Sequence, residues 1–272
     1  MPIEQASHVP DFLHGTAWKE DCTASLTELA IRMGFRAIDT ANQRRHYFEA
    51  GVGQGLAAAY LTGVVTRTDL FLQTKFTYQR GQDHRLPYDP AAGLAVQVAQ
   101  SMASSLEHLG TYYVDSYVLH GPSSGYDWTD SDAEVWEAMR KERDAGRTRF
   151  LGVSNVSLQH LEQMAGAHTE APAFVQNRCF ARVDGIAMCD RFAGSERLFT
   201  GFLASDREHR GFTSSSDHRT CPGCECDSSA DCVRVRTRSR DVAADWYFRS
   251  RAHEAGPGCP RPDPSGGRGT GD

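Results

Sequence analysis

Ala-Ile-Asp-Thr-Ala, residues 37–41, is the stretch that decides the fold, because a short apolar run ends there on the carboxylate of Asp39. Two other runs end in a similar way, Leu-Gln-Thr-Lys-Phe around Lys75 and Tyr-Val-Leu-His-Gly around His120. Helical patterns separate the three runs, as expected of a chain that alternates strands and helices. In a parallel barrel the carboxyl ends of the strands meet at one face. The pattern therefore predicts that these three side chains share one site.

The alternation continues on both sides of these runs. About six strand–helix steps of roughly 30–40 residues each follow one another, which is the rhythm of a (β/α)8 barrel. A first strand or turn is expected at 12–18. Further strands are expected at 35–41, 70–76, 114–120, 150–155 and 174–177, and helices at 25–33, 49–61, 91–109, 132–145 and 158–165. The predicted fold class is therefore α/β, of the (β/α)8 TIM-barrel type.

The chain changes character near residue 183. Apolar periodicity fades there, and Ser, Arg, Asp, Gly and Cys dominate. We therefore divide the chain into the N-terminal part of a barrel, residues 1–182, and a largely irregular or disordered segment, residues 183–272. A complete barrel needs two more strands, and none is evident in the second segment. The barrel is expected to be incomplete, with an open side between its sixth and first strands.

The net charge, the apolar runs and the first residues of the chain indicate which partners and which cellular location to expect. The net charge of -6 is mild, which argues against a nucleic-acid or membrane-surface partner. No run of about 18 apolar residues occurs, so no membrane span is expected. The first residues, Met-Pro-Ile-Glu-Gln, carry neither a basic patch nor an apolar signal core. We expect a soluble, cytoplasmic protein.

The cysteines concentrate in the second segment. Cys221, Cys224, Cys226 and Cys232 fall close together, and turns at Pro-Gly help thiolates converge, so a structural zinc site is one interpretation. The spacing is not that of a usual zinc finger, because Cys-x-Cys is too tight and no second paired knuckle follows. An accidental cluster is the favoured interpretation, and no metal site is predicted. The alternative for the whole chain is a non-catalytic protein whose Cys/Arg-rich tail binds a partner or a metal.

Five short motifs, taken in order, resemble the aldo-keto reductase family. They are Gly-Phe-Arg-Ala-Ile-Asp-Thr-Ala (34–41), Leu-Gln-Thr-Lys (72–75), Asp-Ser-Tyr-Val-Leu-His-Gly (115–121), Gly-Val-Ser-Asn (152–155) and Val-Gln-Asn (175–177). Each motif is weak alone, and the joint order and spacing carry the resemblance, which covers about residues 12–182. It implies an oxidoreductase that reduces aldehydes or ketones to alcohols with NADPH. The implied partner is a small-molecule carbonyl substrate.

The resemblance also implies catalytic residues. Asp39, Lys75 and His120 match the aspartate, lysine and histidine of the family by motif. The family's tyrosine usually lies where this chain has Arg44, but the loop is longer here. Tyr47 is therefore assigned the proton-donor role, and His46 is the competing placement.

Three further residues match the family's cofactor contacts. Ser154, Asn155 and Gln176 match the residues that hydrogen-bond the nicotinamide carboxamide. Each candidate also has an ordinary interpretation. Ser154 and Asn155 are suited to cap the following helix, and a lone histidine is most often a paired core residue. The joint pattern favours a site.

The implied chemistry has a physical basis. Hydride addition to a carbonyl carbon leaves an alkoxide that needs a proton. A tyrosine hydroxyl, with an ordinary pKa near 10, becomes a suitable donor when a lysine cation lowers that pKa. The aspartate keeps the lysine charged and oriented, and the histidine directs the carbonyl oxygen.

Translation out of frame is our hypothesis for the last third of the chain. Permitted codons for Arg197–Ser215, read from the second base, can spell a segment that resembles the family's seventh strand. The same shift applied to Arg234–Glu254 can spell the eighth strand and its Gly-Thr-Ser turn. The family uses these strands to contact the nicotinamide and to hold the phosphates and adenosine of the cofactor. The resemblance therefore implies weak or absent NADPH binding and marginal folding.

Overall fold

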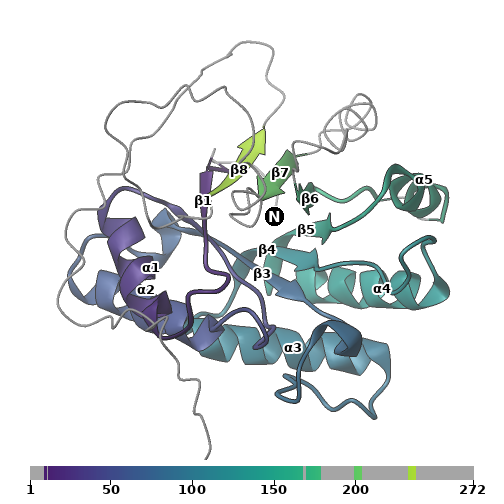
Figure 1. Ribbon diagram of the computed structural model, residues 1–272, viewed down its shortest axis with the longest axis horizontal. Coiled ribbons are helices and arrows are strands. Elements are labelled where there is room, and N and C mark those ends of the chain that lie inside the picture. Colours follow the sequence, from purple (N-terminus) through teal and green to yellow (C-terminus); the bar gives the residue numbers. More distant parts are fainter. Residues whose placement is uncertain (1–8, 11, 168–169, 179–198, 204–231, 237–272) are drawn as a thin grey trace, which may run out of the picture.

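The computed structural model describes residues 9–10, 12–167, 170–178, 199–203 and 232–236 (Figure 1). Strands and helices alternate through most of this length. The strands are β1 (Phe12–Gly15), β2 (Ala37–Asp39), β3 (Phe71–Phe76), β4 (Val114–Leu119), β5 (Thr148–Ser154), β6 (Phe174–Arg178), β7 (Phe199–Leu203) and β8 (Cys232–Arg236). The helices are α1 (Thr23–Arg32), α2 (Glu49–Leu61), α3 (Leu94–Leu109), α4 (Asp130–Asp144) and α5 (Leu158–Ala167), with short 3-10 turns η1 (Glu20–Cys22), η2 (Arg67–Asp69) and η3 (Gln79–Gly81).

The eight strands form a closed ring in chain order, with α1–α5 outside it (Figure 1). Strands β1 to β7 are parallel to their neighbours in the sequence. Strand β8 runs antiparallel to both β7 and β1 and joins the two edges. The predicted α/β class is confirmed over β1 to β6, where six parallel strands alternate with the five helices α1 to α5.

The predicted incomplete (β/α)8 barrel is confirmed in its six parallel strand units, and two short strands, β7 and β8, pair across the side between β6 and β1 that was expected to be open. The free edges of β6 and β1 present rows of backbone donors and acceptors, which readily pair with another strand. Residues 232–236, Cys-Val-Arg-Val-Arg, alternate apolar and polar residues with the two-residue period of a strand. This short signal is easily overlooked in a segment whose other residues show little apolar periodicity. The remainder of residues 183–272 lies outside the described residues.

Several element boundaries differ from the sequence prediction for local reasons. The first strand ends at Gly15 rather than at Trp18, because Trp18 turns the chain with a φ of 62°. Helix α3 begins at Leu94 rather than at 91. The Asp89 carboxylate accepts a hydrogen bond from the Ala91 backbone N–H at 2.9 Å, which holds a turn there, and Gly93 caps the helix in an extended conformation.

The interior of the barrel is layered by the two-residue period of its strands. Phe71, Phe150 and Phe174 pack ring against ring at the amino ends of their strands, with centroids 5.6–6.4 Å apart. Two residues further along, Gln73 and Gln176 point the same way as Phe71 and Phe174. An aromatic layer therefore supports a polar layer nearer the mouth.

A second apolar core lies between the strands and the helices, where Trp136, Met102 and Leu56 are fully buried. Helices α2 and α3 approach closely at Gly53. A Cβ built on Gly53 would lie 1.9 Å from the backbone oxygen of His108, so only glycine permits this packing. Among the described residues, no helix is both long and apolar enough for a membrane span.

Candidate active site

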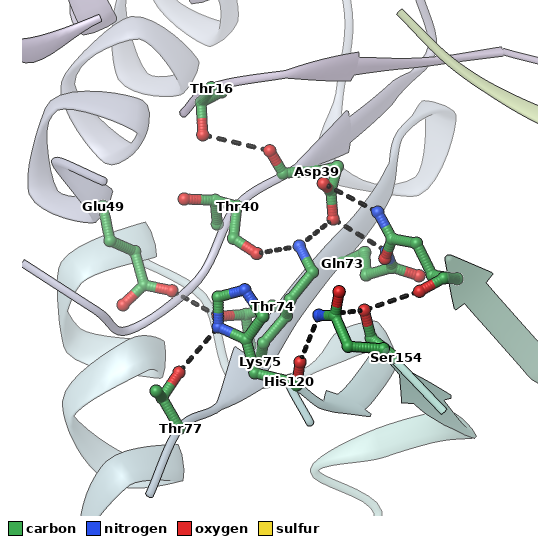
Figure 2. A network of polar contacts seen from close by, with 12 residues as sticks. Thr16, Asp39, Thr40, Glu49, Gln73, Thr74, Lys75, Thr77, His120 and Ser154 are labelled. Atoms are coloured by element: carbon green, nitrogen blue, oxygen red, sulfur yellow. Dashed lines mark hydrogen bonds and ion pairs between the residues drawn. The ribbon is translucent and has the colours of Figure 1, made fainter. Parts of the chain in front are cut away.

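A buried ion pair occupies the centre of the polar layer. The ammonium of Lys75 donates to Oδ1 of Asp39 and, at 2.8 Å, to the backbone oxygen of Thr40 (Figure 2). Lys75 is 0% exposed and Asp39 1% exposed, so water screens neither charge. Burial lowers the pKa of Lys75, while the charge of Asp39 and its hydrogen bond oppose that shift. The pair is brought together because Asp39 ends β2 and Lys75 lies two residues beyond its register partner, Gln73.

Two amides complete the surroundings of Asp39. Gln73 Nε2 donates to Asp39 Oδ1 at 2.7 Å and to Gln176 Oε1 at 2.8 Å. Gln176 Nε2 donates to Asp39 Oδ2 at 3.2 Å. The carboxylate thus accepts hydrogen bonds from one ammonium and two amides. Gln176 comes from β6, so residues far apart in sequence meet here.

Tyr47 lies beside the ion pair. The ammonium nitrogen of Lys75 is 5.3 Å from the centroid of the Tyr47 ring. The Tyr47 ring meets the ring of His120 edge-on, with centroids 5.8 Å apart. The imidazole Nδ1 of His120 is 2.8 Å from the hydroxyl of Thr77, which fixes the ring's orientation (Figure 2). The structure therefore brings Asp39, Tyr47, Lys75 and His120 together.

The lengthened loop after β2 is held by its own side chains. Asn42 Nδ2 donates to the backbone oxygen of Ser101 at 3.1 Å, and Gln43 Nε2 donates to that of Gly81 at 2.7 Å. The backbone N–H of Tyr47 then donates to the oxygen of Gln43 at 3.0 Å. These bonds anchor the loop that carries Tyr47, and the Tyr47 side chain is buried.

The neighbouring residue, His46, faces another partner. Its ring lies against the indole of Trp18, with centroids 4.0 Å apart and an interplanar angle of 36°. Trp18 is 55% exposed, and its backbone N–H donates to the oxygen of His46 at 2.7 Å. Of the two residues considered for the proton-donor position, Tyr47 is the one in contact with His120.

Ser154 and Asn155 lie at the carboxyl end of β5. The Ser154 hydroxyl donates to the backbone oxygen of Gln176 at 2.6 Å. Asn155 Nδ2 donates to the backbone oxygen of His120 at 2.7 Å and to Ser154 Oγ at 3.1 Å. Asn155 adopts a left-handed φ of 54°, which asparagine tolerates better than most residues. Ser154, Asn155 and Gln176 therefore form one polar edge next to His120.

A second buried carboxylate supports the site from outside the barrel. Glu49, in the first turn of α2, accepts a hydrogen bond from the Thr74 hydroxyl (Figure 2). Its other carboxylate oxygen lies 3.0 Å from Nδ1 of His108 on α3. The hydrogen bond with Glu49 raises the pKa of His108. Glu49 therefore ties α2 to β3 and α3, two residues after Tyr47.

Comparison with known proteins decides the family. A family model described as "Aldo/keto reductase family" matches residues 13–181, more than half of the chain. The chain belongs to the aldo/keto reductase family. The match ends close to the proposed boundary at residue 182, and the resemblance drawn from the five motifs is confirmed.

Several curated members of the family are similar to this chain. Aldo-keto reductase AKR2E4 of Bombyx mori is 32% identical, covering 55% of this chain and 46% of its own length. Morphine 6-dehydrogenase of Pseudomonas putida is 34% identical, covering 57% and 45%. Prostaglandin F synthase 1 of Bos taurus is 30% identical, covering 60% and 52%. The chain spans about half the length of the curated relatives it matches.

Solved structures show the same fold. The Bombyx mori AKR2E4 structure, determined in complex with NADP, has a TM-score of 0.57 at 25% identity and covers 73% of this chain and 62% of its own. An aldo/keto reductase from Brucella melitensis has a TM-score of 0.55 at 27% identity and covers 69% and 65%.

The tail interpretation gains no support. The described residues contain no cluster of three or more side chains suited to hold a metal ion. Cys232 lies in β8, and Cys221, Cys224 and Cys226 lie outside the described residues.

Sequence reasoning missed three polar residues of the site, Gln73, Thr77 and Glu49. Gln73 had a usable signal, because it lies two residues before Lys75 and so faces the same side of the strand. Thr77 and Glu49 act through contacts between segments distant in sequence, for which the sequence carries no comparable signal.

Proposed function

We propose that this chain carries the acid–base site of a reductase that converts aldehydes or ketones to alcohols. The observation that carries the proposal is the contact of Tyr47 with both the buried Lys75 ammonium and the His120 ring. A phenol beside a buried cation suits general acid catalysis, because the cation stabilises the phenolate that forms when the proton is given up. Nothing else in the described part of the chain offers this combination.

The roles of the four residues follow from their contacts. Tyr47 gives its hydroxyl proton to the oxygen of the reacting carbonyl, and Lys75 stabilises the tyrosinate that remains. Asp39 keeps Lys75 protonated in spite of burial, since a buried ammonium otherwise loses its proton. His120, oriented through Thr77, directs the carbonyl oxygen toward the phenol. Tyr47 is reprotonated from solvent after the alcohol leaves.

NADPH is the proposed reductant, and when bound it supplies the hydride for the carbonyl carbon. The donor set of this structure fits the nicotinamide end of that cofactor. Asn155 uses both N–H groups of its amide within the protein, while its Oδ1 has no donor among the described residues. Ser154 and Gln176 add a hydroxyl and an amide at the same edge. These groups are complementary to a primary carboxamide.

We further propose that the grip on the rest of the cofactor is weak. Strand β8 runs antiparallel, so its carboxyl end lies at the face opposite the site. Strand β8 therefore does not direct its carboxyl end toward Gln176, where the carboxyl ends of the parallel strands meet. Binding is expected only at roughly millimolar NADPH, about −4 kcal/mol.

A rate measurement tests the function. NADPH oxidation is followed with a panel of aldehydes and ketones at millimolar cofactor, for the wild type, Tyr47→Phe and His46→Gln. Tyr47→Phe should lower the turnover rate by about 10²–10⁴-fold, because it removes the general acid. His46→Gln is the matched control and should change the rate only a few-fold.

The outcomes separate the two placements. Equal rates for Tyr47→Phe and the wild type contradict the role of Tyr47. A larger loss in His46→Gln than in Tyr47→Phe transfers that role to His46. Wild-type protein that binds NADPH yet reduces no member of the panel contradicts the proposed reaction. Tight NADPH binding, in the low micromolar range or below, contradicts the weak grip, and the nucleotide sequence around codons 178–200 tests the frame hypothesis.

A further inference from the structure

We propose that Gln73 is a positioning residue that fixes the amide of Gln176 in the orientation needed to recognise a primary carboxamide. The inference rests on the proposed function, because it names how the nicotinamide end of the cofactor is recognised. Gln73 does not touch the reacting atoms. It acts through Gln176 and Asp39.

The three residues form a closed ring of hydrogen bonds. Gln73 lies opposite Asp39 in the sheet register and points into the barrel. One of its N–H groups is directed at Asp39 Oδ1 at 2.7 Å, and the other at Gln176 Oε1 at 2.8 Å. Gln176 Nε2 closes the ring on Asp39 Oδ2 at 3.2 Å. All three side chains are buried.

The charge of Asp39 decides which way both amides face. An ionised carboxylate only accepts hydrogen bonds, so each amide must present its nitrogen to Asp39. Gln73 then has one N–H left, and that N–H requires an acceptor. Gln176 Oε1 is that acceptor, so a flip of the Gln176 amide would break two bonds at once: Gln73 would face an N–H and Asp39 would face an oxygen.

What remains on Gln176 has a definite chemistry. Its nitrogen has a second N–H and its oxygen a second lone pair, and neither has a partner among the described residues. One donor beside one acceptor matches the acceptor and donor of a primary carboxamide. Without Gln73, nothing in the ring holds Gln176 Oε1, and the amide is free to rotate away from Asp39 Oδ2.

Side-chain amide NMR tests this directly on the full chain. The ¹H–¹⁵N signals of Gln176 are identified by their loss in Gln176→Met, and are then followed in Gln73→Met. The Gln176 pair should shift in Gln73→Met and exchange with solvent about tenfold faster, as expected when one hydrogen bond is lost. Gln97→Met is the matched control, because Gln97 is as buried as Gln73, at 6% against 4%, but lies on α3 outside the barrel.

A Gln176 pair that is unchanged in Gln73→Met overturns the proposal, and so does an equal change in Gln97→Met. If Gln73→Met does not fold, Gln73→Thr takes its place, because threonine suits a strand but does not reach Gln176. In the wild type, the Gln73 and Gln176 amide protons should exchange more slowly than those of the exposed Gln54. Equal rates also overturn the proposal.

Titration with NADPH separates this inference from the proposed function. Gln176 signals that respond to Gln73→Met but not to NADPH support the ring and contradict the use of NADPH. NADPH affinity should fall about tenfold in Gln73→Met, the equivalent of one lost hydrogen bond. An affinity within twofold of the wild type, with the Gln176 signals responding to NADPH, overturns the positioning role.

Discussion

Replacing Lys75 by methionine should unfold this protein more easily than replacing almost any surface residue. The change removes the ammonium and its bonds to Asp39 and the Thr40 backbone, while methionine fills a similar volume. Within the described part of the chain, Asp39 is then left as a buried carboxylate whose side-chain donors are the amides of Gln73 and Gln176. Breaking one partner of a buried ion pair costs about 3–5 kcal/mol, because the remaining charge is uncompensated.

The measurement is urea unfolding followed by far-UV circular dichroism at neutral pH. With a slope of about 2 kcal/mol per molar urea, the loss lowers the midpoint by about 1.5–2.5 M. Lys141→Met is the matched control. Lys141 is exposed on α4, so the same substitution there should change the free energy of unfolding by less than about 0.5 kcal/mol.

The double variant Lys75→Met/Asp39→Asn tests whether the ion pair couples the two residues. It removes both charges, so it should be about 1–3 kcal/mol more stable than Lys75→Met alone. If the two substitutions instead destabilise additively, the ion pair is not what couples them. A cost below about 1 kcal/mol for Lys75→Met alone would equally contradict a buried, uncompensated Asp39.

Three other outcomes follow from individual contacts. Gly53→Ala should destabilise by about 1–3 kcal/mol in urea unfolding, although alanine favours helices, because its Cβ would lie 1.9 Å from the oxygen of His108; a neutral or stabilising effect contradicts the close packing of α2 on α3. Glu49 raises the pKa of His108, so the stability it adds is full below about pH 6.5 and is lost as pH rises through the folded pKa. His108→Gln should remove this loss of stability with rising pH from the pH dependence of the urea midpoint. An unchanged pH profile contradicts the coupling between His108 and Glu49. Asp132→Asn should cost about 1–3 kcal/mol and make residues 122–129 more sensitive to limited proteolysis, because the carboxylate accepts from Ser123, Thr129 and Tyr78; unaltered cleavage contradicts this anchoring.

The grouping of Asp39, Lys75 and His120 could be predicted from sequence because strand ends converge in a parallel barrel. Each of the three follows an apolar run, and each run forms a strand. The placement of Tyr47 depended on a loop whose length departs from the family pattern. Its anchoring through Asn42 and Gln43 joins the loop to α3 and η3, which no local pattern reveals.

Strands β7 and β8 were missed for a different reason. Each has only five residues, so the alternation in β8 is a weak signal on its own, and both strands pair with strands that are distant in sequence. The edges of β1 and β6 would otherwise carry unpaired backbone N–H and C=O groups, and these edges exist only once the sheet has folded. A short segment can therefore form a strand by pairing with a sheet edge even though its own sequence pattern is too weak to predict one.

The layering of the barrel explains how the acid–base group is built by only part of the chain. Asp39, Gln73 and Gln176 rest on the aromatic layer of Phe71, Phe150 and Phe174, and every one of these residues precedes residue 178. All residues of the hydrogen-bonded ring of Asp39, Gln73 and Gln176, and the Lys75 ammonium, therefore precede β7 in the sequence. The residues proposed for proton transfer and carboxamide recognition lie in the part of the chain that matches the family. Closure of the barrel, in contrast, depends on β7 and β8. A change confined to the segment after residue 182 should therefore alter cofactor affinity far more than the local bonds of Lys75.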